Sequence, residues 1–124
     1  MDTDILVKEG QRLVGYLDEG KIKPRGAVWV YSSDADAWKL WIVPSQTITD
    51  KREFYRIVAQ TITNHREELP SLDVGMVEFK LADHPVVEGL GRFMHVEGIS
   101  AVSVSNNRFN GFLLPDGVVL RMAV

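Results

Sequence analysis

The sequence predicts an α+β fold: a mixed, mainly antiparallel sheet of about five to six strands, with two or three helices packed on one face. Three features favour it: a β-branched and aromatic hairpin pattern over 27–43, a long apolar helical stripe over 50–69, and a strand-rich final third. The expected order is α-β-β-α-β-α-β-β-β, in which consecutive hairpins favour antiparallel pairing. Because 124 residues is an ordinary size for one domain, we expect residues 1–124 to form a single α+β domain.

The first expected element is a helix from Thr3 to Gly20. Its buried face is expected to contain Leu6, Gly10, Leu13, Val14 and Leu17, which recur at helical spacing. Gly20 suits a left-handed helix end. Gly10 weakens the helix, but on a buried face it allows another backbone to approach closely.

Two strands are expected next, Ala27–Tyr31 and Trp38–Val43, joined by a polar turn over 32–37 as an antiparallel hairpin. Because side chains alternate along a strand, the aliphatic positions of both strands are expected on the face that meets the helices. The aromatic positions expected to share the opposite face are Trp29, Tyr31 and Trp41.

A helix over Asp50–Leu69 is the next expected element. Asp50 begins a capping-box pattern, and Pro70 ends the helix. Ile62 lies within the apolar stripe of this helix, whereas Arg56 lies on its polar face. We therefore expect the helix to be a main contributor to the core.

The remaining elements are strands and one short helix. The strand Leu72–Leu81 is followed by a helix from His84 to Met94, which its glycines make marginal. Three more strands follow, and turns at 106–107 and 115–117 separate them. These strands are Ile99–Ser105, Phe109–Leu114 and Val118–Val124.

The composition excludes several classes of protein. The chain contains no cysteine, so disulfides, thiolate metal sites and cysteine nucleophiles are excluded. The net charge of −3 weighs against binding to nucleic acid, which usually requires a basic balance. The acidic start lacks the features of a signal peptide, and no apolar run approaches the roughly 20 residues of a membrane span. We therefore expect a cytoplasmic protein without a membrane partner.

Neither a metal nor a cofactor is expected. The histidines have no ligand partner at the short spacing of a zinc motif, and no glycine-rich phosphate loop is present. These histidines are His65, His84 and His95.

The aromatic residues of the hairpin lead to the first functional hypothesis. Trp29, Tyr31 and Trp41 fit three interpretations: core packing, a protein interface, or a platform for stacking bases, which the acidic balance disfavours. Arg108 lies in a polar segment, 106–111, that suits either a hairpin turn or a rim that recognises a partner. The leading hypothesis is a small non-catalytic domain that associates with a protein partner or, most simply, with itself as a homodimer.

The alternative hypothesis is a metal-dependent, nuclease-like enzyme. Glu78 and Lys80 alternate to the same face of an expected strand. In one group of nucleases, carboxylates at such a site hold magnesium while the lysine supports the attacking water. Asp73, Asp34 or Asp36 would supply the further carboxylate. The same Glu-x-Lys spacing also arises on any solvated strand face.

Overall fold

The computed structural model describes residues 3–109 and 111–124, with the backbone alone described at 106–109 and 112–115. Its helices are α1 (Thr3–Asp18), α2 (Lys51–Asn64) and α3 (Pro85–Phe93), with a short 3₁₀ helix, η1 (Val74–Met76), before the third strand. The strands are β1 (Gly26–Ser32), β2 (Ala37–Val43), β3 (Val77–Phe79), β4 (Val102–Phe109) and β5 (Phe112–Met122). Within the described residues, no helix has both the length and the apolar character needed to cross a membrane.

The sheet has the order β3-β2-β1-β5-β4 and confirms the expected α+β class. Neighbouring strands run antiparallel, except for β2 and β3, which pair in parallel. β1 occupies the centre of the sheet. Its residues from Gly26 to Val30 are all buried and form a continuous apolar run, which suits a strand that is covered on both faces. The five strands fall within the expected number.

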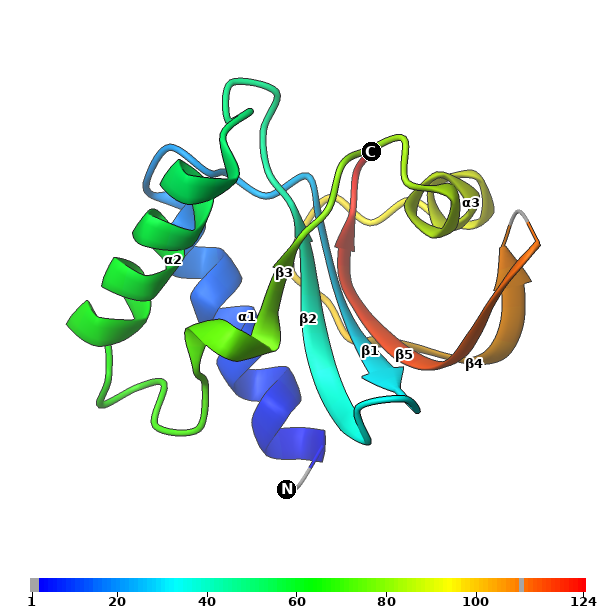
Figure 1. Ribbon diagram of the computed structural model, residues 1–124, viewed down its shortest axis with the longest axis horizontal. Coiled ribbons are helices and arrows are strands. Elements are labelled where there is room, and N and C mark those ends of the chain that lie inside the picture. The colour runs from blue at the N-terminus through cyan, green and yellow to red at the C-terminus, as the bar shows by residue number, and fades with distance from the viewer. Residues whose placement is uncertain (1–2, 110) are drawn as a thin grey trace.

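Helices lie on both faces of this curved sheet (Figure 1). α1 and α2 share one face, as expected, and the core beneath them includes Trp29, Leu40 and Phe54. α3 lies on the opposite face, where Val28 and Leu90 belong to a second core cluster. The reason is alternation: β1 is apolar at consecutive positions, so it presents an apolar row to each face.

α2 forms as expected, although it is shorter than the predicted range. Asp50 is its N-cap and accepts a hydrogen bond from the Arg52 amide at 2.9 Å. The helix ends at Asn64, and Leu69 is fully buried in the turn that follows. Leu69 thus belongs to the core without belonging to the helix. Because its apolar side chain fits the helical stripe, the predicted helix extended to this residue.

The C-terminal third forms two long strands instead of the three expected. Asn106 and Asn107 lie within β4, and residues 115–117 lie within β5. The turn between these strands includes Gly111, whose φ of +83° suits glycine. Pro115 is tolerated because it comes before Gly117, the first β5 residue that pairs with β1. The edge of β5 that faces β1 therefore needs no hydrogen-bond donor at Pro115.

α1 packs closely against the sheet through Gly10. A methyl group at this position would lie 2.5 Å from Nε1 of Trp29 and 2.9 Å from Cδ1 of Leu120, so no larger residue fits without a shift. The close approach predicted for Gly10 is therefore made to side chains of the sheet. The Trp29 indole N–H is buried there without a hydrogen-bond partner among the described residues.

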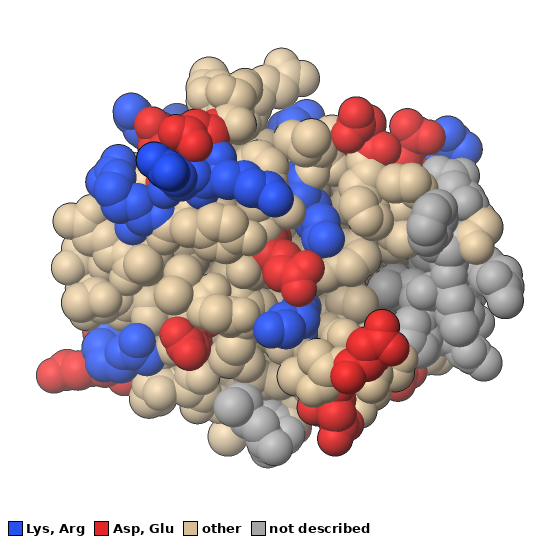
Figure 2. Space-filling view, viewed as in Figure 1, with Lys and Arg blue, Asp and Glu red and all other residues tan. Residues whose placement is uncertain are grey.

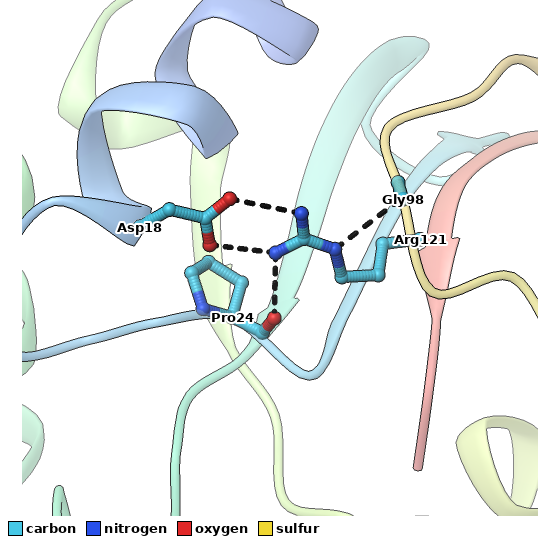
Figure 3. A network of polar contacts seen from close by, with 4 residues as sticks. All are labelled: Asp18, Pro24, Gly98 and Arg121. Atoms are coloured by element: carbon cyan, nitrogen blue, oxygen red, sulfur yellow. Dashed lines mark hydrogen bonds and ion pairs between the residues drawn. The ribbon is translucent and has the colours of Figure 1, made fainter.

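A buried arginine joins the end of α1 to β5 (Figure 3). Arg121 forms a bidentate ion pair with Asp18: Nη1 donates to Oδ1 at 2.6 Å, and Nη2 donates to Oδ2 at 2.9 Å. Nη1 also donates to the Pro24 carbonyl at 3.0 Å, and Nε donates to the Gly98 carbonyl at 3.3 Å. A β-bulge in the β1–β5 pairing accompanies this arrangement and re-aims the side chains of β5. The arginine thus links three segments that are distant in sequence.

Candidate functional site

The structure separates two of the three aromatic residues expected on one face. Trp29 pairs with Leu40 and lies in the core beneath α1, with only 1% of its surface exposed. Trp41 pairs with Val28 and packs against the cluster on the α3 face. The expected shared face is therefore wrong for Trp41, whereas Trp29 and Tyr31 do lie on the same face of β1. Alternation holds within each strand, but the cross-strand register, which the turn sets, places Trp29 and Trp41 each opposite an aliphatic residue.

Tyr31 and Trp38 are the aromatic residues that the hairpin brings together. They oppose each other in the β1–β2 register, and their rings meet edge to face with centroids 5.6 Å apart. Trp38 was not among the expected partner-binding residues, and the signal that identifies it is the register across the turn at 33–36. The two rings contribute to a groove of about 390 Å³, which we call the hairpin groove. Its lining consists of Leu6, Tyr31, Asp36, Ala37, Trp38, Lys39 and Met76.

The hairpin groove draws its apolar surface from separate parts of the fold. Leu6 comes from α1 and is almost fully buried, while Met76 comes from η1 and is half-buried. Trp38 is also half-buried, because it packs against the core beneath α1 and α2. An apolar group that enters the groove would therefore meet two aromatic rings and a flexible thioether side chain.

Tyr31 is held in place by the turn. Its hydroxyl donates a hydrogen bond to Oδ1 of Asp36, a turn residue with a φ of +48°. This hydrogen bond is the main reason that the pKa of Tyr31 is raised above its ordinary value, and burial and the carboxylates of Asp36 and Asp116 add to the effect. Tyr31 therefore stays neutral and keeps its proton for this hydrogen bond at physiological pH.

Glu78 and Lys80, the pair expected to carry nuclease chemistry, bind each other. Lys80 Nζ lies 3.3 Å from Oε1 of Glu78 and 4.6 Å from the centroid of the Trp41 ring. Asp73 instead caps η1, where its Oδ1 accepts a hydrogen bond from the Gly75 amide at 3.4 Å. The lysine and two of the candidate carboxylates are thus engaged in local contacts.

The other candidate carboxylates, Asp34 and Asp36, lie in the β1–β2 turn. Glu78 pairs with Trp41 on β2. Asp36 lies before the start of β2, and the extended chain between Asp36 and Trp41 spans on the order of 16 Å. In the part of the chain that the structure describes, no group of three His, Cys, Asp or Glu residues is placed to hold a metal ion. The fold therefore does not bring these aspartates to the Glu78–Lys80 pair.

A second, smaller hollow of about 240 Å³ lies where β3 leads into α3, and its polar lining comes from Lys51, Lys80, Asp83 and His84. His84 caps α3, since its Nδ1 accepts a hydrogen bond from the Val86 amide at 3.2 Å. Burial lowers the pKa of His84 below its ordinary value, Lys80 lowers it further, and Asp83 opposes the shift. Two lysines and one aspartate line this hollow, and one of the lysines, Lys80, is already paired with Glu78.

The other histidines make local contacts. His65 stacks on Tyr16 with ring centroids 3.6 Å apart, and His95 Nε2 lies 3.4 Å from Oε1 of Glu97. Arg108, the remaining residue predicted to bind a partner, lies outside the residues whose side chains the structure describes.

No family model, curated protein or solved structure matches this chain. A function has to be inferred from the two hollows and the side chains that line them. The hairpin groove is the larger of the two, and the ring pair of Tyr31 and Trp38 contributes to its lining.

Proposed function

We propose that this chain is a non-catalytic domain that associates with another protein through the hairpin groove. The observation that carries the proposal is the ring pair of Tyr31 and Trp38, set beside Leu6 and Met76 in a groove of about 390 Å³. Aromatic residues supply much of the energy at the centres of interfaces, because they bury large areas with few rotatable bonds. A groove of this size fits an inserted side chain better than it fits a flat contact.

Two features support a groove that is prepared for binding. The β1–β2 register fixes the backbone of both ring residues, and Asp36 holds the hydroxyl of Tyr31. Trp38 is anchored by its packing against the core beneath α1 and α2. Binding therefore has to order few groups, which reduces the entropy lost on association.

The proposal keeps the mode of action expected from the sequence and changes the residues. Tyr31 remains a candidate, and Trp38 replaces Trp29, which is buried beneath α1, and Trp41, which lies on the other face. A homodimer is one form that the association can take, since a two-fold axis lets one surface bind itself. The nuclease alternative has no comparable support, because the lysine that it needs is already paired with a neighbouring glutamate.

A Trp38→Ala variant tests the proposal. Sedimentation velocity measures self-association, and affinity capture from the cells of origin detects a different partner. Arg56→Ala, on the exposed face of α2, is the matched control. We expect the wild type and the control to associate equally, and the folded Trp38→Ala variant to lose the association. The proposal is wrong if that variant associates as strongly as the wild type, or if the wild type neither self-associates nor captures a protein.

A further inference from the structure

We infer that the segment that enters the hairpin groove belongs to a different protein and carries an apolar side chain flanked by lysine or arginine. The inference rests on the proposed function, because it specifies the chemistry of the partner. It follows from the carboxylates that border the groove and from the poor match between the groove and the basic segments of a second copy of this chain.

Acidic side chains border the hairpin groove at the turn. Asp34 and Asp36 belong to the segment that joins β1 to β2, and both are exposed. Figure 2 shows acidic groups gathered over the end of the molecule where this turn lies in Figure 1. Lys39 is the cation of the lining, and its Nζ donates to the Gly75 carbonyl at 3.2 Å, so it is directed toward η1. The turn therefore presents negative charge to an incoming segment.

Asp116 adds a third carboxylate from the neighbouring strand. It precedes Gly117, which pairs with Val30, so it lies beside Tyr31 across the β1–β5 pair. Farther along β5, every second side chain lies in the core beneath α1. By the same alternation, Asp116 lies on this face of the sheet, which is also the face of the groove. Asp116 is also exposed. The groove is thus bordered by carboxylates from two separate segments.

A basic segment with an apolar anchor matches both properties of the hairpin groove. The apolar side chain would contact Trp38 and Met76, while the stems of flanking lysines or arginines lie along the rings. The charged ends of these side chains would reach the carboxylates at the border, where charge-assisted hydrogen bonds are strong. An acidic segment would instead face three carboxylates with one ammonium group to offset them.

A second copy of this chain is a poorer match. Its basic connector, 21–25, contains a large apolar residue, Ile22, but this residue is fully buried. The basic residues at the start of α2 lie next to Phe54, which is also fully buried. At both places a second copy offers positive charge without an exposed apolar anchor.

Two exposed apolar residues of this chain do adjoin a basic residue: Leu81 follows Lys80, and Phe93 follows Arg92. Each of these cations is already paired with a glutamate, Lys80 with Glu78 and Arg92 with Glu88. A second copy therefore presents these anchors beside neutralised charge, and the structure favours a different protein as the partner.

Titration with synthetic peptides tests the inference on the full chain. The probe is a pentapeptide in which leucine is flanked on each side by two lysines, and the comparison peptide has glutamates in place of the lysines. The readout is the indole N–H signal of Trp38 in the NMR spectrum, assigned with a Trp38→Phe variant. We expect the lysine peptide to shift this signal and the glutamate peptide to leave it unchanged. Added salt should weaken the binding, because exposed charges are screened.

Two variants that each remove one negative charge provide the matched comparison. Asp116→Asn removes a charge at the border without touching the hydrogen bond to Tyr31, and it should weaken binding of the lysine peptide several-fold. Asp83→Asn, at the second hollow, should leave it unchanged. An equal response to both peptides, or no response to either, overturns the inference. The proposed function is tested separately, since it fails only by the association experiments with Trp38→Ala.

Discussion

Replacing Gly10 with alanine sets helix propensity against packing. At an exposed position within a helix, this change stabilises by about 1 kcal/mol. At Gly10 the added methyl would lie 2.5 Å from Nε1 of Trp29 and 2.9 Å from Cδ1 of Leu120, both in the core. Overpacking of a core costs about 1–3 kcal/mol, and such short contacts call for the upper end of that range. We therefore expect a net loss of about 2 kcal/mol in the free energy of unfolding.

Gly15→Ala is the matched control, because it is the same substitution in the same helix. Its added methyl would meet Cδ1 of Ile99 at 3.8 Å, which is an ordinary van der Waals distance. This variant should gain about 0.5–1 kcal/mol from helix propensity and the smaller entropy of the unfolded chain. The two variants should therefore differ by about 3 kcal/mol, with effects of opposite sign.

Urea titration followed by far-UV circular dichroism measures both free energies of unfolding. In thermal unfolding, the loss predicted for Gly10→Ala corresponds to a fall in Tm of about 8 °C. If Gly10→Ala is as stable as Gly15→Ala, then α1 does not press against the Trp29 indole and the packing explanation for Gly10 is refuted.

Three further perturbations act on contacts described above. Arg121→Ala should lower the free energy of unfolding by about 2–3 kcal/mol in a urea titration, because a carboxylate and two carbonyls lose their donor. In the same assay, Ile62→Ala should cost about 2–5 kcal/mol and Arg56→Ala little, and equal effects would mean that the buried face of α2 is misassigned. The pKa of His84 is lower in the folded chain than its ordinary value of 6.5, so its stabilising contribution is present above that pH and is lost as the pH falls below it. His84→Asn, which can still cap α3, should flatten the decrease in Tm between about pH 7.5 and pH 5, and an unchanged slope would refute this role.

The fold class was predictable because local patterns and tertiary structure agree at several elements. Asp50 is both the predicted and the observed cap of α2, and Ile62 lies in the core as its stripe predicts. The apolar run of β1 is also a true strand. At these places the residue that favours the local structure is also the residue that packs against the sheet.

Which side chains meet across the hairpin was not predictable from alternation alone. A shift of one residue in register moves every side chain of a strand to the other face. The turn at 33–36 sets a register that pairs Tyr31 with Trp38 and leaves Trp29 and Trp41 on opposite faces. The remaining walls of the groove come from Leu6 and from η1, and no local pattern connects these segments to the hairpin.

The sequence predicted a break within β5, and this error has a similar physical origin. Residues 115–117 have the composition of a turn, which favours a break in the strand. In the fold, Gly117 pairs with Val30 on one side and Val104 on the other, so tertiary pairing overrides the local preference. These partners are far from Gly117 in the sequence, and a local pattern contains no information about them.

The position of β1 between β2 and β5 has a consequence for biosynthesis. The hairpin with β2 involves nearby residues, but the other edge of β1 pairs with residues 117–122. Until the ribosome has released those residues, a nascent chain carries an apolar strand with an unpaired edge, and Asp18 cannot yet form its ion pair with Arg121. An open apolar edge is a template for aggregation. Fragments that stop before β5 should therefore bind chaperones and precipitate, and the chain should acquire its folded state only after translation has passed residue 122.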